Sequence, residues 1–197
     1  DGDRVATLMW NHQQHFETYI GAPAGGLVTH TLNLRLHPDE LGYIAGHAEA
    51  RVLIADKSVW PLVEQLTDRH RFEHVVAVGD GETPDGATDF EALIGAADET
   101  AFVDRELDER SAAAMCYTSG TTGRPKGVVY THRAIALHAL TVAMSLRMGA
   151  DDTIMPFVPM FHANAWCFPF CAAIVGAGQV FPGPRLDPVS LLDGLAG

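Results

Sequence analysis

Residues 117–132 read Tyr-Thr-Ser-Gly-Thr-Thr-Gly-Arg-Pro-Lys-Gly-Val-Val-Tyr-Thr-His. Glycines let a backbone approach an anion closely and reach positive φ, hydroxyl groups donate hydrogen bonds, and a lysine adds a full charge. This combination indicates a loop that wraps a polyphosphate, such as the triphosphate tail of a nucleotide. The candidate phosphate ligands are Thr118, Ser119, Gly120, Thr121, Thr122, Gly123 and Lys126.

The residues around this loop predict a strand, a loop and a second strand. Residues 112–117 and 127–130 are apolar runs typical of strands, and a helix is expected over 133–148. The common nucleotide-binding loop instead leads into a helix and places Ser or Thr directly after its lysine, whereas Gly127 follows Lys126 here. Loop amides, hydroxyls and Lys126 must therefore meet the phosphate charge without a helix dipole.

The preceding sequence alternates between strand and helix patterns. Such alternation predicts an α/β fold with a largely parallel sheet covered by helices. Strands are expected over 5–9, 27–30, 51–55 and 75–78, and helices over 12–20, from Pro38 onward and over 59–66.

Residues 79–110 form a loose, charged excursion rich in Gly, Asp, Thr and Pro. A solvated excursion within one domain is preferred over a linker between domains, because apolar side chains offer anchors. The expected anchors are Phe90, Leu93, Ile94 and Phe102.

The C-terminal part contains an apolar run over 163–175, which predicts a buried helix and its lead-in. The run is shorter than the roughly 20 residues that span a bilayer and it contains Pro169. Residues 189–195 also have a helical pattern.

Composition narrows the class of protein. The formal net charge of −12 and the absence of a basic run argue against a nucleic-acid surface. Three cysteines, an odd number, do not suggest a disulfide framework, and no signal peptide opens the chain. A reducing cytoplasm is the expected location, without a transmembrane segment.

The segment 117–132 resembles the phosphate-binding signature of the adenylate-forming superfamily, which includes acyl-CoA synthetases, luciferases and the adenylation domains of peptide synthetases. Two further phrases are similar to the fatty acyl-CoA synthetase branch, and residues 10–36 are similar to its long-chain members. The two phrases are Val-Pro-Met-Phe-His-Ala-Asn-Ala-Trp at 158–166 and Phe-Pro-Gly-Pro-Arg-Leu-Asp-Pro at 181–188. The resemblance spans nearly the whole chain.

The resemblance implies an enzyme that joins a fatty acid to coenzyme A through an acyl-adenylate, with release of AMP and pyrophosphate. Residues 118–122 and Lys126 would contact the β and γ phosphates of ATP, and Thr118 is a candidate Mg²⁺ ligand. His162 and Trp166 would belong to the acyl site, with the tryptophan as a gate. If that segment is helical, these two side chains share one face, because they lie four residues apart.

The resemblance also implies a larger protein. Residues 1–197 would be an interior fragment of the N-terminal adenylation domain, with an α/β portion over 1–110 and the phosphate-loop and acyl-site portion over 111–197. In this superfamily the catalytic lysine, the glutamate that shares the metal and the aspartate that holds the ribose come later in sequence. The fragment alone is expected to be inactive, and the complete protein to be a homodimer.

Two alternatives to this function stay open. One is an adenylate-forming ligase for another carboxylate, such as an aryl acid. The other is a noncatalytic nucleotide-binding remnant that keeps the loop.

Three smaller interpretations concern single side chains. A metal site at His12 and His15 is disfavoured, because no third ligand is close in sequence. Cys167 and Cys171 are interpreted as buried apolar thiols. His132 is interpreted as a strand-to-helix boundary residue.

Overall fold

The computed structural model describes residues 2–118 and 123–196, and within them seven strands form one sheet in the order β5-β4-β3-β1-β2-β6-β7. Neighbouring strands are parallel except for β6 and β7, which are antiparallel. The predicted α/β class with a largely parallel sheet is therefore confirmed. The strands are β1 (Arg4–Leu8), β2 (Val28–Thr31), β3 (Ala50–Asp56), β4 (His74–Val78), β5 (Thr88–Asp89), β6 (Ala112–Thr118) and β7 (Lys126–Thr131).

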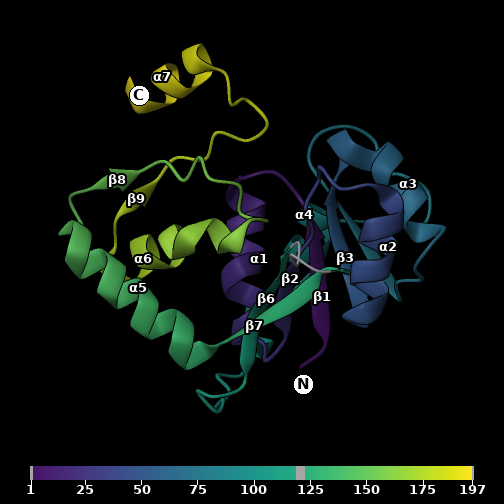
Figure 1. Cartoon of the computed structure of the whole chain (residues 1–197), viewed down its shortest axis with the longest axis horizontal. Coiled ribbons are helices and arrows are strands. Elements are labelled where there is room, and N and C mark those ends of the chain that lie inside the picture. The colour runs from purple at the N-terminus through teal and green to yellow at the C-terminus, as the bar shows by residue number, and fades with distance from the viewer. Residues whose placement is uncertain (1, 119–122, 197) are drawn as a thin grey trace.

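Helices cover both faces of this sheet. Helices α2 and α3 lie on one face, and α1, α5 and α6 lie on the other (Figure 1). The helices are α1 (Gln13–Ala24), α2 (Pro38–His47), α3 (Trp60–Thr67), α4 (Phe90–Gly95), α5 (His132–Leu146), α6 (Phe168–Val175) and α7 (Pro188–Ala196), with 3₁₀ turns η1 (Lys57–Val59), η2 (Glu99–Ala101) and η3 (Ala163–Cys167).

Local sequence explains where the helices start. Pro38 opens α2, where a missing N–H costs nothing, and the Thr131 hydroxyl caps α5 by accepting a hydrogen bond from the Ala134 amide at 3.1 Å. His132 is the first residue of α5, as predicted. The prediction that the first helix ends at Gly21 is wrong, because α1 continues through Pro23. Its last turn closes with a bond from the Gly25 amide to the Gly21 carbonyl, which needs no donor from the proline.

The two faces have separate apolar clusters. On the α2 and α3 side, leucines and alanines of β1 and β3 pack against both helices with almost no exposed area. On the other side, Tyr19 of α1 packs with Ala139 of α5, with Phe170 and Cys171 of α6, and with Cys167 just before α6. The first cluster packs α2 and α3 onto the sheet, and the second joins the sheet to the C-terminal third of the chain.

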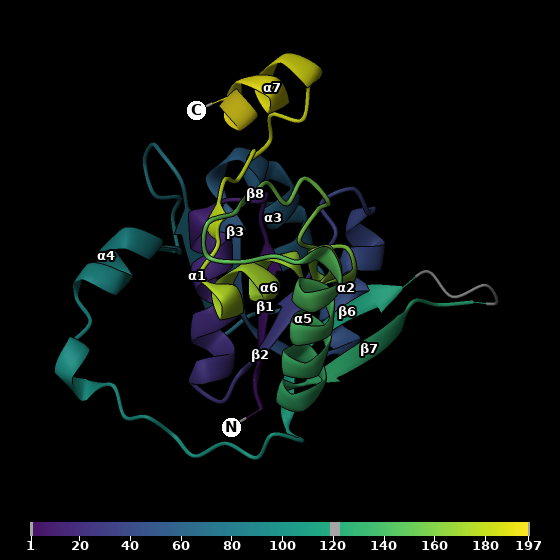
Figure 2. The same ribbon diagram turned by 90° about the vertical axis from the view of Figure 1, so that its left-hand side faces the viewer.

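The segment between β4 and β6 is less loose than the sequence suggested. It contains β5, α4 and η2, and Phe90 is buried as an anchor. The other three predicted anchors are wrong, because Leu93 and Ile94 are exposed and Phe102 is 65% exposed. From α4 to β6 the chain runs as a wide arc away from the sheet, so these side chains have no layer to pack against (Figure 2).

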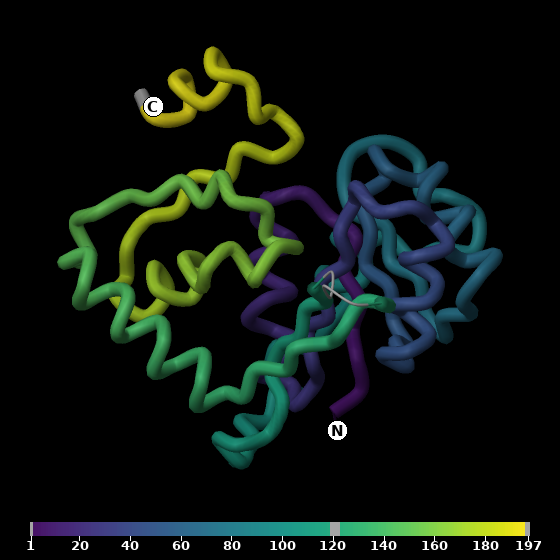
Figure 3. Tube along the Cα trace, viewed as in Figure 1, coloured from purple at the N-terminus to yellow at the C-terminus, as the bar shows by residue number. Residues whose placement is uncertain are grey.

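The chain ends in a small ribbon and a helix. Strands β8 (Thr153–Ile154) and β9 (Gly178–Gln179) are parallel, and α7 stands apart from the two main layers beyond them (Figure 3). The prediction of a helix over 189–195 is confirmed by α7. No helix among the described residues has the length and apolar character that crossing a membrane requires.

Candidate functional site

The two described ends of the signature lie opposite each other. Thr118 closes β6, Lys126 opens β7, and the two residues are cross-strand partners, so their side chains lie on the same face of the hairpin. Gly123 has φ of +141°, a conformation that favours glycine. The other predicted phosphate ligands, Ser119, Gly120, Thr121 and Thr122, lie outside the described residues.

A cavity of about 300 Å³ opens beside this hairpin, at the carboxyl ends of β2 and β6. Ligands of open α/β sheets bind at this edge, where the strands end and the loops begin. His162 and Thr118 both line it, and Lys126 is not among its lining residues. Its further polar lining consists of Thr31, Asn33, Glu40, Cys116, Tyr117 and Tyr130. We call this space the polar cavity.

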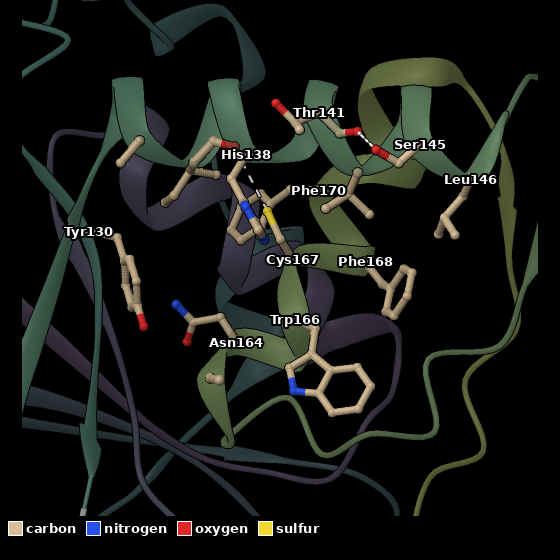
Figure 4. A pocket seen from close by; sticks show the side chains of 14 residues that line it. Tyr130, His138, Thr141, Ser145, Leu146, Asn164, Trp166, Cys167, Phe168 and Phe170 are labelled. Atoms are coloured by element: carbon tan, nitrogen blue, oxygen red, sulfur yellow. Dashed lines mark hydrogen bonds between the residues drawn. The ribbon is translucent and has the colours of Figure 1, made fainter.

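A second cavity, of about 680 Å³, lies between α5 and the segment around η3 (Figure 4). We call it the apolar cavity. Its α5 wall includes Ile135, Val142 and Leu146, and its other wall includes Trp166, Phe168 and Phe170. Trp166 is 55% exposed, so its indole stands at the edge of this space and not in the core.

The two cavities adjoin. Tyr130 and Ala163 line both of them. The Tyr130 hydroxyl lies 3.7 Å from the Cys116 Sγ, and burial raises the pKa of Tyr130 to about 12. A ligand in the polar cavity and a ligand in the apolar cavity would therefore meet at Tyr130, which stays a neutral phenol near pH 7.

The backbone of η3 separates His162 from Trp166. Residues 163–167 all have φ between 44° and 70°, a left-handed turn, and the right-handed helix begins only at Phe168. The premise that a helix places His162 and Trp166 on one face is therefore wrong. A left-handed turn reverses the sense in which side chains advance, so His162 faces the polar cavity and Trp166 the apolar one.

The histidines of α1 are engaged in hydrogen bonds. His12 caps α1 by accepting from the His15 amide at 3.2 Å, which leaves its Nε2 to donate to the Asp56 Oδ1 at 3.0 Å. His15 contacts the Thr7 hydroxyl at 3.0 Å and the Trp10 carbonyl at 2.9 Å, and burial lowers its pKa to about 3. Among the described residues, no group of three or more His, Cys, Asp or Glu side chains is placed to hold a metal.

The cysteines are buried, as predicted. Burial, together with the neighbouring Cys171, raises the pKa of Cys167 to about 12, and burial also raises the pKa of Cys116 and Cys171. Thiols in this state are poor nucleophiles near neutral pH, because the reactive thiolate is scarce.

Sequence reasoning missed one residue that positions both cavities. The Asn11 side chain donates to the carbonyls of Pro156 at 2.6 Å and Val158 at 2.8 Å, and its Oδ1 accepts from the Met160 amide at 2.7 Å. These three bonds tie the end of β1 to the segment that leads into His162. Nothing in the local sequence marks them, because the partners are 145 to 149 residues away.

Comparisons with known proteins show which enzymes the chain is similar to. The chain is 46% identical over 194 residues to a long-chain-fatty-acid–CoA ligase of Thermus thermophilus, covering 98% of this chain and 35% of that enzyme. It is 41% identical over 198 residues to a medium-chain-fatty-acid–CoA ligase of Ectopseudomonas oleovorans, covering 96% and 36%. The chain thus spans about a third of the length of these curated relatives.

A solved structure shares the fold. The anthranilate CoA ligase AuaEII, in complex with anthranoyl-AMP, superposes with a TM-score of 0.85 at 26% identity, covering 98% of this chain and 38% of that one. The family described as AMP-binding enzyme matches residues 1–196. The chain therefore belongs to the AMP-binding enzyme family.

Proposed function

We propose that the complete protein is a fatty acyl-CoA ligase that converts a fatty acid, ATP and coenzyme A into acyl-CoA, AMP and pyrophosphate. The observation that carries the proposal is the pair of adjoining cavities, one polar beside the signature hairpin and one apolar along α5. A carboxylate at their junction would lie next to a nucleotide phosphate, which is the proximity that acyl-adenylate formation requires. The identity of 41–46% to fatty-acid–CoA ligases supports an aliphatic substrate.

The signature would hold the leaving pyrophosphate. We assign Thr118, Ser119, Gly120, Thr121, Thr122, Gly123 and Lys126 to the phosphates of ATP. Hydroxyls, loop amides and one ammonium group can stabilise negative charge that builds up on the leaving group. Trp166 would control entry to the apolar cavity, and His162 would face the reacting carboxylate from the polar side.

Mg²⁺ fits this donor set through Thr118. Thr118 lines the polar cavity, and Mg²⁺ commonly keeps several waters and binds phosphate oxygens with only one or two protein ligands. When bound, the ion would neutralise charge on the phosphates. The hydroxyl itself would contribute one oxygen ligand and fix the end of β6 beside the nucleotide.

The chain covers about a third of the length of its relatives, which limits the activity that can be expected of it alone. We propose that residues 1–197 are an interior fragment of the N-terminal adenylation domain, and that the residues completing catalysis lie in the remaining two thirds that the relatives possess. The 197-residue chain is accordingly expected to be inactive alone. We also propose a cytoplasmic homodimer as the working form of the complete protein.

Acid-dependent exchange of pyrophosphate into ATP, measured on the complete open reading frame, tests the function. An acyl series from butyrate to palmitate should show exchange with a maximum at medium or long chains, and benzoate should support much less. Trp166→Ala should change the dependence on chain length, with Trp60→Ala, outside both cavities, as the matched control. Absence of exchange with every aliphatic acid contradicts the proposal.

An aryl acid is the second candidate substrate. The fold shared with the anthranilate CoA ligase favours it, although at 26% identity against 41–46% for the fatty-acid enzymes. Exchange with benzoate or anthranilate that exceeds every aliphatic acid would select this alternative.

A further inference from the structure

One carboxamide lines the mainly apolar cavity, whose other polar side chains are those of Tyr130, His138, Thr141 and Ser145. Asn164 is 5% exposed and lines the cavity, where Figure 4 shows its side chain on the wall between Tyr130 and Trp166. Its backbone has φ of 50°, a conformation that asparagine tolerates better than most side chains. A buried polar side chain in such a wall calls for a partner.

The surroundings fix which end of the carboxamide faces the cavity. Its Oδ1 lies 3.5 Å from the Thr31 hydroxyl, which donates to it, and 3.5 Å from the Tyr19 hydroxyl. The Tyr19 hydroxyl has a single proton, which it donates to the closer Met160 carbonyl, so the Thr31 hydroxyl is the donor to Asn164. With the oxygen held toward β2 and α1, the Nδ2 group is left facing the cavity. Within the described part of the chain, no acceptor bonds to that nitrogen, and it is not among the fully buried atoms that lack a partner, so it is open to an acceptor that enters the cavity.

The position of Asn164 along the cavity matters as much as its chemistry. It directly follows Ala163, which lines both cavities, and it shares the apolar cavity with Tyr130, which also lines both. From this end the apolar wall extends along α5 toward Leu146 and Phe168 (Figure 4). An aliphatic acid would therefore place its tail along α5 and its head group beside Asn164.

We propose that the Asn164 Nδ2 donates a hydrogen bond to the carboxylate of the acyl substrate, so that the cavity selects aliphatic carboxylates over uncharged chains of equal length. The inference rests on the proposed function, because it assumes that the apolar cavity holds the acyl group. A hydrogen bond to a charged acceptor is stronger than one between neutral groups. Loss of such a bond typically weakens binding about tenfold or more.

Binding of laurate and of dodecanol to the full chain, measured by calorimetry, tests the inference. The wild type should bind laurate about tenfold more tightly than dodecanol. Asn164→Asp keeps the shape and the acceptor for Thr31 but removes the donor, so it should abolish the preference and leave the dodecanol affinity within about twofold. Asn164→Gly retains the left-handed backbone and serves if the aspartate variant does not fold.

His138 is the competing donor, because its ring is another nitrogen-bearing group in the lining of this cavity and lies on α5. His138→Gln should keep the preference for laurate. Carbon-13 NMR of carboxyl-labelled laurate measures the pKa of the bound carboxyl, which would not change if Asn164 had a purely structural role. The pKa of the bound carboxyl should rise from wild type to Asn164→Asp, because a donor that favours the charged form is replaced by a carboxylate.

The possible outcomes separate the two proposals. The role of Asn164 is overturned if the wild type binds laurate and dodecanol with equal affinity. It is also overturned if the preference for laurate survives Asn164→Asp and disappears in His138→Gln. In both cases the cavity is still an aliphatic site. If the wild type binds neither laurate nor dodecanol, the assignment of the apolar cavity to the acyl group is overturned, and the proposed function depends on that assignment.

Discussion

The two faces of the sheet are packed for different purposes. On the α2 and α3 face, side chains such as Leu41 and Leu53 are fully buried, and the two cavities that border these helices have volumes of about 300 and 380 Å³. On the α5 and α6 face, a cavity of about 680 Å³ separates the helices from η3, and the outer side of α5 exposes Leu137 and Met144. The comparison teaches that the first face has the more continuous apolar packing, whereas the second holds the larger space for a ligand.

The largest effect on stability is expected when a buried side chain is removed from the α2 and α3 face. Leu53→Ala in β3 should lower the free energy of unfolding by about 2–5 kcal/mol, since the cavity cannot be filled by its neighbours. Leu140→Ala, on the exposed side of α5, should cost less than about 0.5 kcal/mol. Urea unfolding followed by circular dichroism measures both, and equal losses would contradict the division.

The buried histidines give a pH test. His15 lies on the α1 side, and His30 packs against Tyr117 on the other, and burial is the main cause that lowers the pKa of each to about 3. Because the unfolded value is near 6.5, the unfolded chain takes up the protons first, so stability is complete above pH 6.5 and falls as the pH drops toward 3. Between pH 7 and 5 each histidine should cost about 2 kcal/mol.

Substitution separates the two histidines. His30→Phe should flatten the pH dependence of unfolding without a loss at pH 7, because neither ring nitrogen of His30 has a hydrogen-bond partner in the described part of the chain. His15→Phe should also flatten it, but it should lower stability at pH 7, because the Thr7 hydroxyl and the Trp10 carbonyl lose their partner. An unchanged pH dependence in both variants would contradict the assignment of low pKa values.

A smaller effect on stability is expected at Asn11, which joins the end of β1 to the segment before His162. Asn11→Ala removes all three bonds to the 156–160 segment and should lower the free energy of unfolding by about 1–2 kcal/mol. Hydrogen exchange of the Met160 amide, which donates to Asn11, should accelerate more than that of the β3 amides. Asn33→Ala is the matched control and should leave Met160 unaffected, because within the described residues the Asn33 side chain accepts only from the Arg35 amide at 2.9 Å.

The smallest predicted effect has opposite signs in two neighbouring elements. Ala163→Gly should stabilise the protein by about 0.5–1 kcal/mol, because glycine adopts the positive φ of this residue without strain. Ala136→Gly in α5 should destabilise it by about 1 kcal/mol, because glycine is a poor helix residue. Thermal unfolding of the pair measures both, and a loss in Ala163→Gly would argue against the left-handed turn.

Sequence patterns predicted the parts of the fold that local rules control. Alternating apolar segments predicted the parallel sheet, and the residues around 117–132 predicted a strand, a loop and a second strand, which the structure shows paired with Thr118 opposite Lys126. The failures have more than one origin. No local rule shows that Phe102 would face solvent. Likewise, η3 begins with a left-handed turn although its alanines favour a right-handed helix.

The candidate site also contains residues that the sequence predicted and residues that it did not. Trp166 was predicted as an acyl-site residue from the phrase it belongs to, and it lines the apolar cavity. Asn164 lies in that same phrase, yet its orientation depends on Thr31, which is 133 residues away. The roles of both residues stay predictions until the variants above are measured.

The long bonds of Asn11 also have a kinetic consequence. Contacts between residues distant in sequence require closure of a large loop, and they form late and slowly compared with a hairpin such as β6–β7. The partners of Asn11 are separated from it by up to 149 residues, and most of the sheet described here lies between them. During synthesis the sheet can therefore assemble while the segment before His162 is still being made, and both cavities take shape only as the last step.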